Sequence, residues 1–196
     1  MTSLATRSTR AQARRAELLD ELVALVLTEG FATFTLDELA RRLHCSKSTL
    51  YGLAASKEQL VVAVVKRFFR RATTAVEERA AVPAGHREQI SGYLLAVAEQ
   101  LQPASPTFFA DVAGFAPARE IYERNTRAAA GRVQQLVTDG VAAGRIRPVD
   151  ASFVGAAVAS VMVAIHRGEI TATTGLDAAA AYRELADLVV AGIAPR

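Results

Sequence analysis

TLDELARRLHCSKSTLY, residues 35–51, predicts two short helices joined by a tight turn. Thr35 followed three residues later by Glu38 is a capping box, which marks a helix start. The apolar residues of this first helix recur at helical spacing: Leu36, Leu39, Ala40 and Leu43. Ser46 then caps the second helix, where Leu50 supplies the inner face. Such a pair is a helix-turn-helix arrangement, whose second helix fits the major groove of DNA.

The rest of the chain also has a helical pattern. No stretch alternates apolar and polar residues for long enough to form a sheet. Glycine and proline breaks, and the stretch from Thr171 to Gly175, divide the chain into about nine helices. The predicted fold class is therefore all-α. Further helices are expected at about 10–28, from 57 onward, and at 87–102, 107–114, 118–143, 151–167 and 178–193, with Gly30 ending the first and Asp150 and Asp177 capping the last two.

The composition fits a globular protein of one domain, or of a small domain fused to a larger one. The chain has 196 residues and a mass of 20.9 kDa, with 51% apolar and 22% charged residues. Its one cysteine excludes an internal disulfide framework, and no Cys/His set has zinc-site spacing. With no signal peptide and no apolar run long enough to cross a bilayer, we expect a cytoplasmic protein that does not engage membranes.

Positive charge is concentrated near the N-terminus. The basic arm, residues 1–16, contains four arginines and no acidic residue, although the whole chain carries only +3. A basic arm ahead of a helix is a common footprint of phosphate binding. A solvated tail has the same composition, so charge alone leaves both interpretations open.

The helix pair and its flanks resemble the tetracycline-repressor (TetR) family of transcriptional regulators. Gly30-Phe31 precedes the pair, Thr49-Leu50-Tyr51 lies in its second helix, and Ser56-Lys57-Glu58-Gln59-Leu60 follows. The last two segments at this distance are a hallmark of the family. The resemblance covers about residues 12–66.

This resemblance implies a helix-turn-helix DNA-binding domain over 1–56, including the basic arm, and a ligand-binding and dimerisation domain over 57–196. It also implies a homodimer, acting as a repressor, that binds a palindromic operator in double-stranded DNA. A small apolar or amphipathic effector would bind among the C-terminal helices and release the DNA. Release requires that the effector bind the DNA-free form more tightly.

Carried over residue by residue, the resemblance implies seven DNA-contacting positions. These are Thr35, Ser46, Lys47, Ser48, Thr49, Tyr51 and Lys57. Thr35 caps its helix beside phosphate, and Lys57 matches a phosphate-contacting lysine. Two departures leave the docking details and the operator sequence open. His44-Cys45 replaces the usual Gly-Val of the turn, which places a non-glycine residue at a left-handed position, and Gly52-Leu53-Ala54 replaces an expected phosphate ligand and an aromatic residue.

The resemblance also implies an effector site among the middle and C-terminal helices. The candidate residues are Phe68, Tyr93, Phe108, Phe109, Phe115, Tyr122, Met162 and His166. The aromatic set, which also includes Phe69, lines a ligand cavity or fills a core, and the sequence does not decide which. His166 and Glu169 form a single i, i+3 pair, which is more typical of a helix end than of a metal site. We therefore expect no metal and no cofactor.

Residues 151–167 are apolar nearly all round, with small residues between the large ones. A helix that is apolar on every side must be covered on every side. Residues 178–193 add a second apolar helix. One subunit has too few helices to cover both, so we predict a two-fold dimer in which these helices form a four-helix bundle.

Two other function classes are weighed against the regulator. A helical-bundle enzyme would need a paired acid and base, a metal set or an activated nucleophile, which three scattered histidines and one cysteine do not supply convincingly. We therefore expect no enzymatic activity. A membrane-surface or adaptor protein using the basic arm would bind anionic vesicles and be indifferent to DNA sequence.

Overall fold

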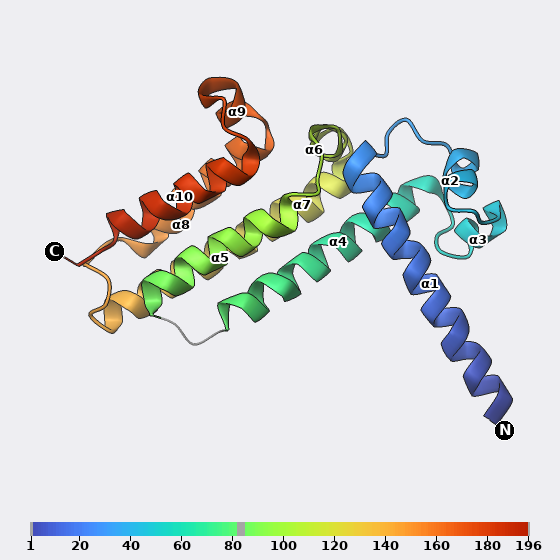
Figure 1. Ribbon diagram of the computed structural model, residues 1–196, viewed down its shortest axis with the longest axis horizontal. Helices are drawn as coiled ribbons and strands as arrows, with labels where there is room; N and C mark the ends of the chain where they lie inside the picture. The colour runs from blue at the N-terminus through green and yellow to red at the C-terminus, as the bar shows by residue number, and fades with distance from the viewer. Residues whose placement is uncertain (1, 82–84, 196) are drawn as a thin grey trace.

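The described part of the chain consists of ten α-helices and contains no strand, which confirms the all-α class (Figure 1). This computed structural model describes residues 2–81 and 85–195, with side chains from Gln12 onward. The helices are α1 (Thr2–Glu29), α2 (Leu36–Arg42), α3 (Lys47–Tyr51), α4 (Lys57–Ala80), α5 (His86–Leu101), α6 (Pro106–Gly114), α7 (Ala116–Ala142), α8 (Ala151–His166), α9 (Glu169–Thr174) and α10 (Ala178–Gly192).

Two predicted helix assignments are wrong. The stretch from Thr171 to Gly175 was expected to be a break, but α9 forms there, so ten helices are described instead of nine. Gly168 and Gly175 flank α9 in left-handed conformations, with φ of +74° and +75°. The first helix begins at Thr2 instead of about Arg10, because no glycine or proline interrupts the chain before Gly30.

The predicted helix caps are confirmed. At α2 the Glu38 N–H donates to Thr35 Oγ1 at 3.2 Å, while the Thr35 N–H donates to Glu38 Oε2 at 2.8 Å. Ser46, Ser56, Asp150 and Asp177 each accept a backbone N–H from the first turn of the following helix. These bonds fix where α2, α3, α4, α8 and α10 begin.

The turn between α2 and α3 is built on a left-handed residue. His44 has φ +48°, the only positive value among the described non-glycine residues. The next N–H, of Cys45, donates to Ala40 O at 3.0 Å, and the Cys45 side chain packs partly buried against the core. The chain therefore makes the predicted turn despite lacking glycine there.

Two apolar cores meet along α4, the long helix that runs from beside α3 to beside α5 (Figure 1). The first joins α1, α2, α3 and the first half of α4 to α6 and the start of α7. The second joins the end of α4 to α5, α7, α8 and α10. Because α6 contributes Phe108 and Val112 to the first core, the N-terminal helices are packed directly on the C-terminal ones.

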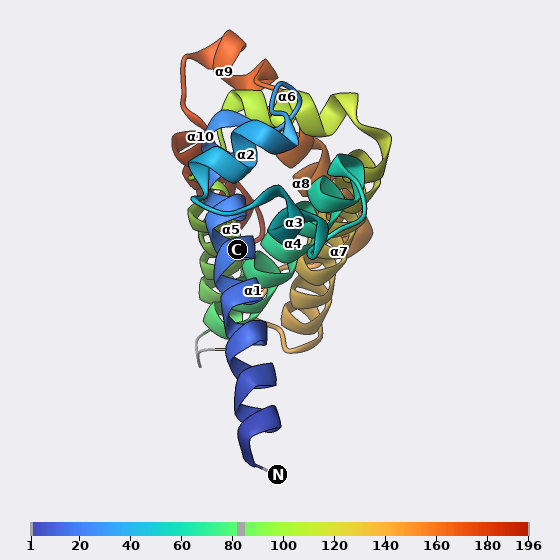
Figure 2. The same cartoon turned by 90° about the vertical axis from the view of Figure 1, so that its right-hand side faces the viewer.

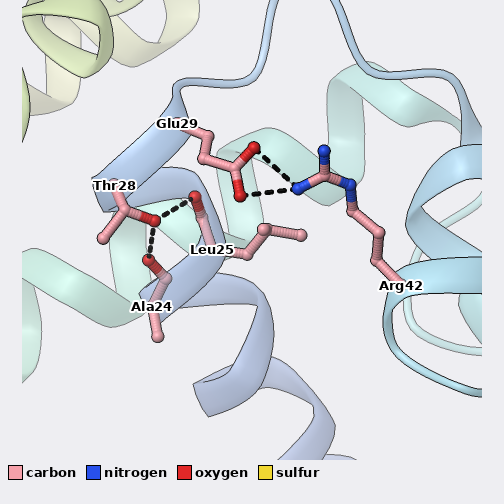
Figure 3. Close-up of polar contacts among 5 residues, drawn as sticks. All are labelled: Ala24, Leu25, Thr28, Glu29 and Arg42. Carbon is pink, nitrogen blue, oxygen red and sulfur yellow. Dashed lines mark hydrogen bonds and ion pairs between the residues drawn. The ribbon is translucent and has the colours of Figure 1, made fainter.

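Ion pairs fix α1 against its neighbours. Asp20 accepts hydrogen bonds from Arg67 Nε and Nη2, both at 2.7 Å, and also pairs with Arg71 of α4. The bond from Arg67 holds the pKa of Asp20 below its usual range. At the other end of α1, Arg42 Nη1 lies 2.5 and 2.6 Å from the two oxygens of Glu29 (Figure 3). These contacts tie α1 to α4 at one end and to α2 at the other.

None of the helices in the described part of the chain is both long enough and apolar enough to cross a membrane.

Candidate DNA-binding surface and effector cavity

The helices α2 and α3 and the start of α4 lie together beside α1 (Figure 2). Exposed polar side chains gather on these elements. Six of the seven predicted DNA-contacting residues are exposed there, and Lys57 is half-buried. The Tyr51 side chain is 52% exposed, whereas the adjacent Leu50 is buried and fixes α3 to the core. The short helix α3 therefore presents a polar and aromatic face to solvent.

Three hydroxyl groups meet at the start of α3. Ser46 Oγ lies 2.7 Å from Ser48 Oγ and 2.8 Å from Thr49 Oγ1, and it also accepts the Thr49 N–H at 3.1 Å. Hydroxyls both donate and accept, so this cluster can hydrogen-bond to base edges and to phosphate oxygens.

Both predicted lysines have protein partners in this structure. Lys47 Nζ pairs with Asp37 Oδ1 at 2.8 Å, and Lys57 Nζ donates to Ala32 O at 2.8 Å. The Lys47 pair is exposed, and such pairs are worth at most about 1 kcal/mol, so a phosphate can replace Asp37 at little cost. In the basic arm, Arg15 Nη2 donates to Leu53 O just after α3. The side chains of Arg7 and Arg10 lie outside the described residues.

A cavity of about 100 Å³ lies between α4, α5, α7 and α8. Four of the eight effector candidates line it: Tyr93, Tyr122, Met162 and His166. Three others do not, because Phe68, Phe108 and Phe115 pack in the first core around Phe31. Phe109 does not line the cavity itself. Its ring stacks on the lining residue His166, with the ring centres 4.7 Å apart.

His166 is held between two tyrosines. The Tyr122 hydroxyl contacts His166 Nδ1, and the Tyr182 hydroxyl lies 2.9 Å from Nε2. Burial lowers the pKa of His166 to about 4 and raises that of Tyr122 to about 12, so all three groups are neutral at neutral pH. Glu169 is exposed, and its Oε1 lies 3.8 Å from Arg167 Nη1.

The helix α6 connects this cavity to the N-terminal helices. Asp111 Oδ2 accepts the Phe31 N–H at 2.5 Å and the Ala32 N–H at 2.8 Å, both in the loop after α1. The carbonyl of Ala32 is the group that Lys57 binds. The loop after α1 is thus held from one side by α6 and from the other by the first residue of α4.

An apolar groove of about 400 Å³ runs between α8 and α10. Phe153 and Leu188 line it, and each is 73% exposed. Large apolar side chains exposed on two adjacent helices are typical of a protein interaction surface.

The N-terminal helices match a known family. The model of bacterial regulatory proteins of the tetR family matches residues 18–64, which span the second half of α1 through the start of α4. Residues 18–64 of the chain belong to the tetR family. An uncharacterized HTH-type transcriptional regulator of Bacillus subtilis, YvaF, is 47% identical to this chain over 51 residues. That match spans about a quarter of either protein.

Solved structures share the whole fold of this chain. A putative transcriptional regulator from Saccharomonospora viridis, in complex with choline, superposes with a TM-score of 0.78 at 15% identity, covering 94% of this chain and all of that one. The ketosteroid transcriptional regulator KstR2 of Mycobacterium tuberculosis gives 0.62 at 20% identity, covering 93% and 96%. At these identities the likeness concerns the fold.

Sequence reasoning missed several residues of this chain. Glu77 and Asn125 line the cavity, and Asp111 holds the loop after α1. Phe69, a member of the aromatic set, also lines the cavity. No local sequence signal marks Asp111, because its partners lie about eighty residues earlier.

Acidification from pH 7 to pH 4.5 is expected to destabilise the fold through His166. Its pKa is about 4 when folded and near 6.5 in an unfolded chain, so only the unfolded chain binds a proton across most of this range. The free energy of unfolding therefore falls as the pH decreases, by about 2 kcal/mol from this group. Denaturant titrations at both pH values measure it. His166→Gln should lose less stability than wild type, and the control His86→Gln should lose as much; an unchanged loss in His166→Gln would refute this account.

Proposed function

We propose that this TetR-family protein is a transcriptional repressor that binds a palindromic operator as a homodimer and releases it when a small effector enters the cavity. The exposed face of α3, anchored by the buried Leu50, is the observation that carries the DNA-binding part of this proposal. The DNA-binding and effector-binding parts correspond to residues 1–56 and 57–196, with the boundary at the start of α4.

The recognition helix α3 would enter the major groove. Ser46, Ser48 and Thr49 would then bind base edges or phosphates at its entrance, and Tyr51 would lie against the DNA. Thr35 and Lys57 would bind phosphate on either side. The start of α4 beside Lys57 supports this arrangement, because a helix N-terminus attracts anions.

A dimer would set two copies of α3 about 34–36 Å apart, the repeat of one DNA turn. The α8 and α10 groove supports it, because its exposed apolar residues would be buried against the same helices of a second copy. Residues 151–167 and 178–193 would then form the predicted four-helix bundle.

The effector step would use the contacts that connect the cavity to α3. A ligand beside Tyr122 and His166 would displace Phe109, and with it α6 and Asp111. Asp111 in turn holds the loop that binds Lys57. A regulator with this fold in complex with choline supports a response to a small molecule.

Tyr51→Ala and Lys57→Ala are each expected to weaken operator binding about tenfold, the effect of one lost base or phosphate contact. The DNA is the duplex that the protein itself enriches from a random pool, and affinity is read by fluorescence anisotropy at stated salt. Lys66→Ala is the matched control, since Lys66 is an exposed lysine further along α4. All three variants should keep the wild-type unfolding midpoint within a few degrees. Unchanged operator affinity in both Tyr51→Ala and Lys57→Ala would contradict the proposed docking.

A further inference from the structure

The charge of the cavity wall selects against anions. Among the sixteen residues that line it, Glu77 is the one acidic residue, and none is a lysine or arginine. His166 is a wall residue too, but burial keeps it neutral. A carboxylate or phosphate ligand would therefore lose its hydration without gaining a counter-charge, which is costly in a partly buried site.

Glu77 has free capacity for a cation. Its Oε2 accepts from Arg132 Nε at 3.2 Å, while its Oε1 has no partner among the described residues. Arg132 does not line the cavity, and both side chains are roughly 40% exposed, at 42% for Glu77 and 36% for Arg132. The pair thus lies at the edge of the cavity: Glu77 lines the cavity, and Arg132 contacts Glu77 without lining it.

Aromatic rings supply the rest of the recognition. Phe69, Tyr93 and Tyr122 line the cavity from three different helices, α4, α5 and α7. Aromatic faces attract cations, most strongly where water is excluded. The Tyr93 hydroxyl is in a buried residue, has no hydrogen-bond partner among the described residues, and is close enough to Glu77 that this carboxylate adds to the effect of burial in raising its pKa to about 12. Tyr93 is therefore free to contact a ligand beside Glu77.

We propose that the effector is a small organic cation of the substituted-ammonium class, held by these three aromatic rings with Glu77 as its counter-charge. This inference rests on the proposed function, in which the cavity is the effector site. The cavity volume is about 100 Å³. An apolar cavity of about 150 Å³ accommodates benzene, so this smaller cavity suits only a compact head group.

Three probes of similar shape, each with three methyl groups on a quaternary nitrogen or carbon, test the charge directly. They are choline, its uncharged isostere 3,3-dimethylbutan-1-ol and the carboxylate 3,3-dimethylbutanoate. Isothermal titration calorimetry at neutral pH on the DNA-free full-length protein should show choline binding at least about tenfold more tightly than the alcohol, and the carboxylate most weakly. Equal or tighter binding of the alcohol or the carboxylate, or no saturable binding of choline, would overturn the inference.

Two variants locate the effect. Glu77→Gln keeps the shape of the side chain and should weaken choline binding about tenfold while leaving the alcohol unchanged. Glu78→Gln is the matched control, because Glu78 is exposed on the same helix and does not line the cavity. Choline affinity that is unaffected by Glu77→Gln would remove Glu77 from the site and overturn the proposal.

Failure of this inference can be distinguished from failure of the proposed function. Operator binding is measured in the same preparation without any probe. A protein that binds its operator but rejects choline loses this inference alone, whereas one that enriches no operator loses the proposed function.

Discussion

Leu188→Glu is expected to convert the dimer into a monomer and to weaken operator binding at least about a hundredfold. Leu188 is 73% exposed beside the groove between α8 and α10, so the substitution should be tolerated by a single subunit. In the proposed dimer two copies of this face are buried together, and each glutamate would lose its hydration there without gaining a partner. Losing the second recognition helix removes the gain that comes from binding two half-sites at once.

Sedimentation velocity and operator titration together measure this effect. Leu188→Met is the matched control, because it keeps an apolar side chain of similar volume and should leave both the dimer and the affinity in place. Helicity of the Leu188→Glu variant by circular dichroism shows whether the subunit still folds. A Leu188→Glu protein that remains dimeric with wild-type affinity would place the dimer elsewhere.

Asp111→Ala is expected to lower the free energy of unfolding by about 2 kcal/mol, the usual worth of hydrogen bonds to a charged group. One carboxylate oxygen accepts two N–H groups, from Phe31 and Ala32, and no other hydrogen bond to those two groups is described. Operator affinity should also fall several-fold, although Asp111 lies in α6, because the freed loop no longer positions Lys57. Chemical denaturation and operator titration of the same variant measure both effects.

Two further variants control this prediction. Asp111→Asn keeps an oxygen that can accept both bonds and should lose less stability than Asp111→Ala. Gly30→Ala disturbs the same contact from the loop after α1. The added Cβ would lie 2.5 Å from Asp111 Oδ2, at a residue with φ +81°. Gly144→Ala, with φ +67° and open space around it, isolates the cost of the left-handed backbone, which is about 1 kcal/mol. Equal losses at Gly30 and Gly144, with Asp111→Ala neutral, would refute the role of Asp111.

The helix-turn-helix could be predicted from the sequence because its determinants are local. Thr35 and Glu38 cap each other within one turn, and Ser46 caps α3 in the same way. The boundaries of α9 could not be predicted, because threonines and a terminal glycine usually mark a loop, and here two left-handed glycines enclose one short helix.

The cavity could be predicted only in part, because long-range packing decides which face of a helix lines it. Phe68 and Phe69 are adjacent on α4, yet Phe68 contacts Phe108 in the first core while Phe69 lines the cavity. The sequence alone makes Phe68 and Phe69 equal candidates for the cavity. The place of Glu77 in the cavity could not be predicted for the same reason, because it depends on helices far along the chain.

Selection of bound duplexes from a random DNA pool, at stated salt, tests the central claim most directly. The account predicts one enriched palindrome whose half-sites lie about 10–10.5 base pairs apart, or a multiple of that, centre to centre, as a two-fold dimer with two copies of α3 requires. Binding that falls steeply with salt and enriches no sequence would instead mean that the protein neutralises phosphate without reading bases, and would contradict the account.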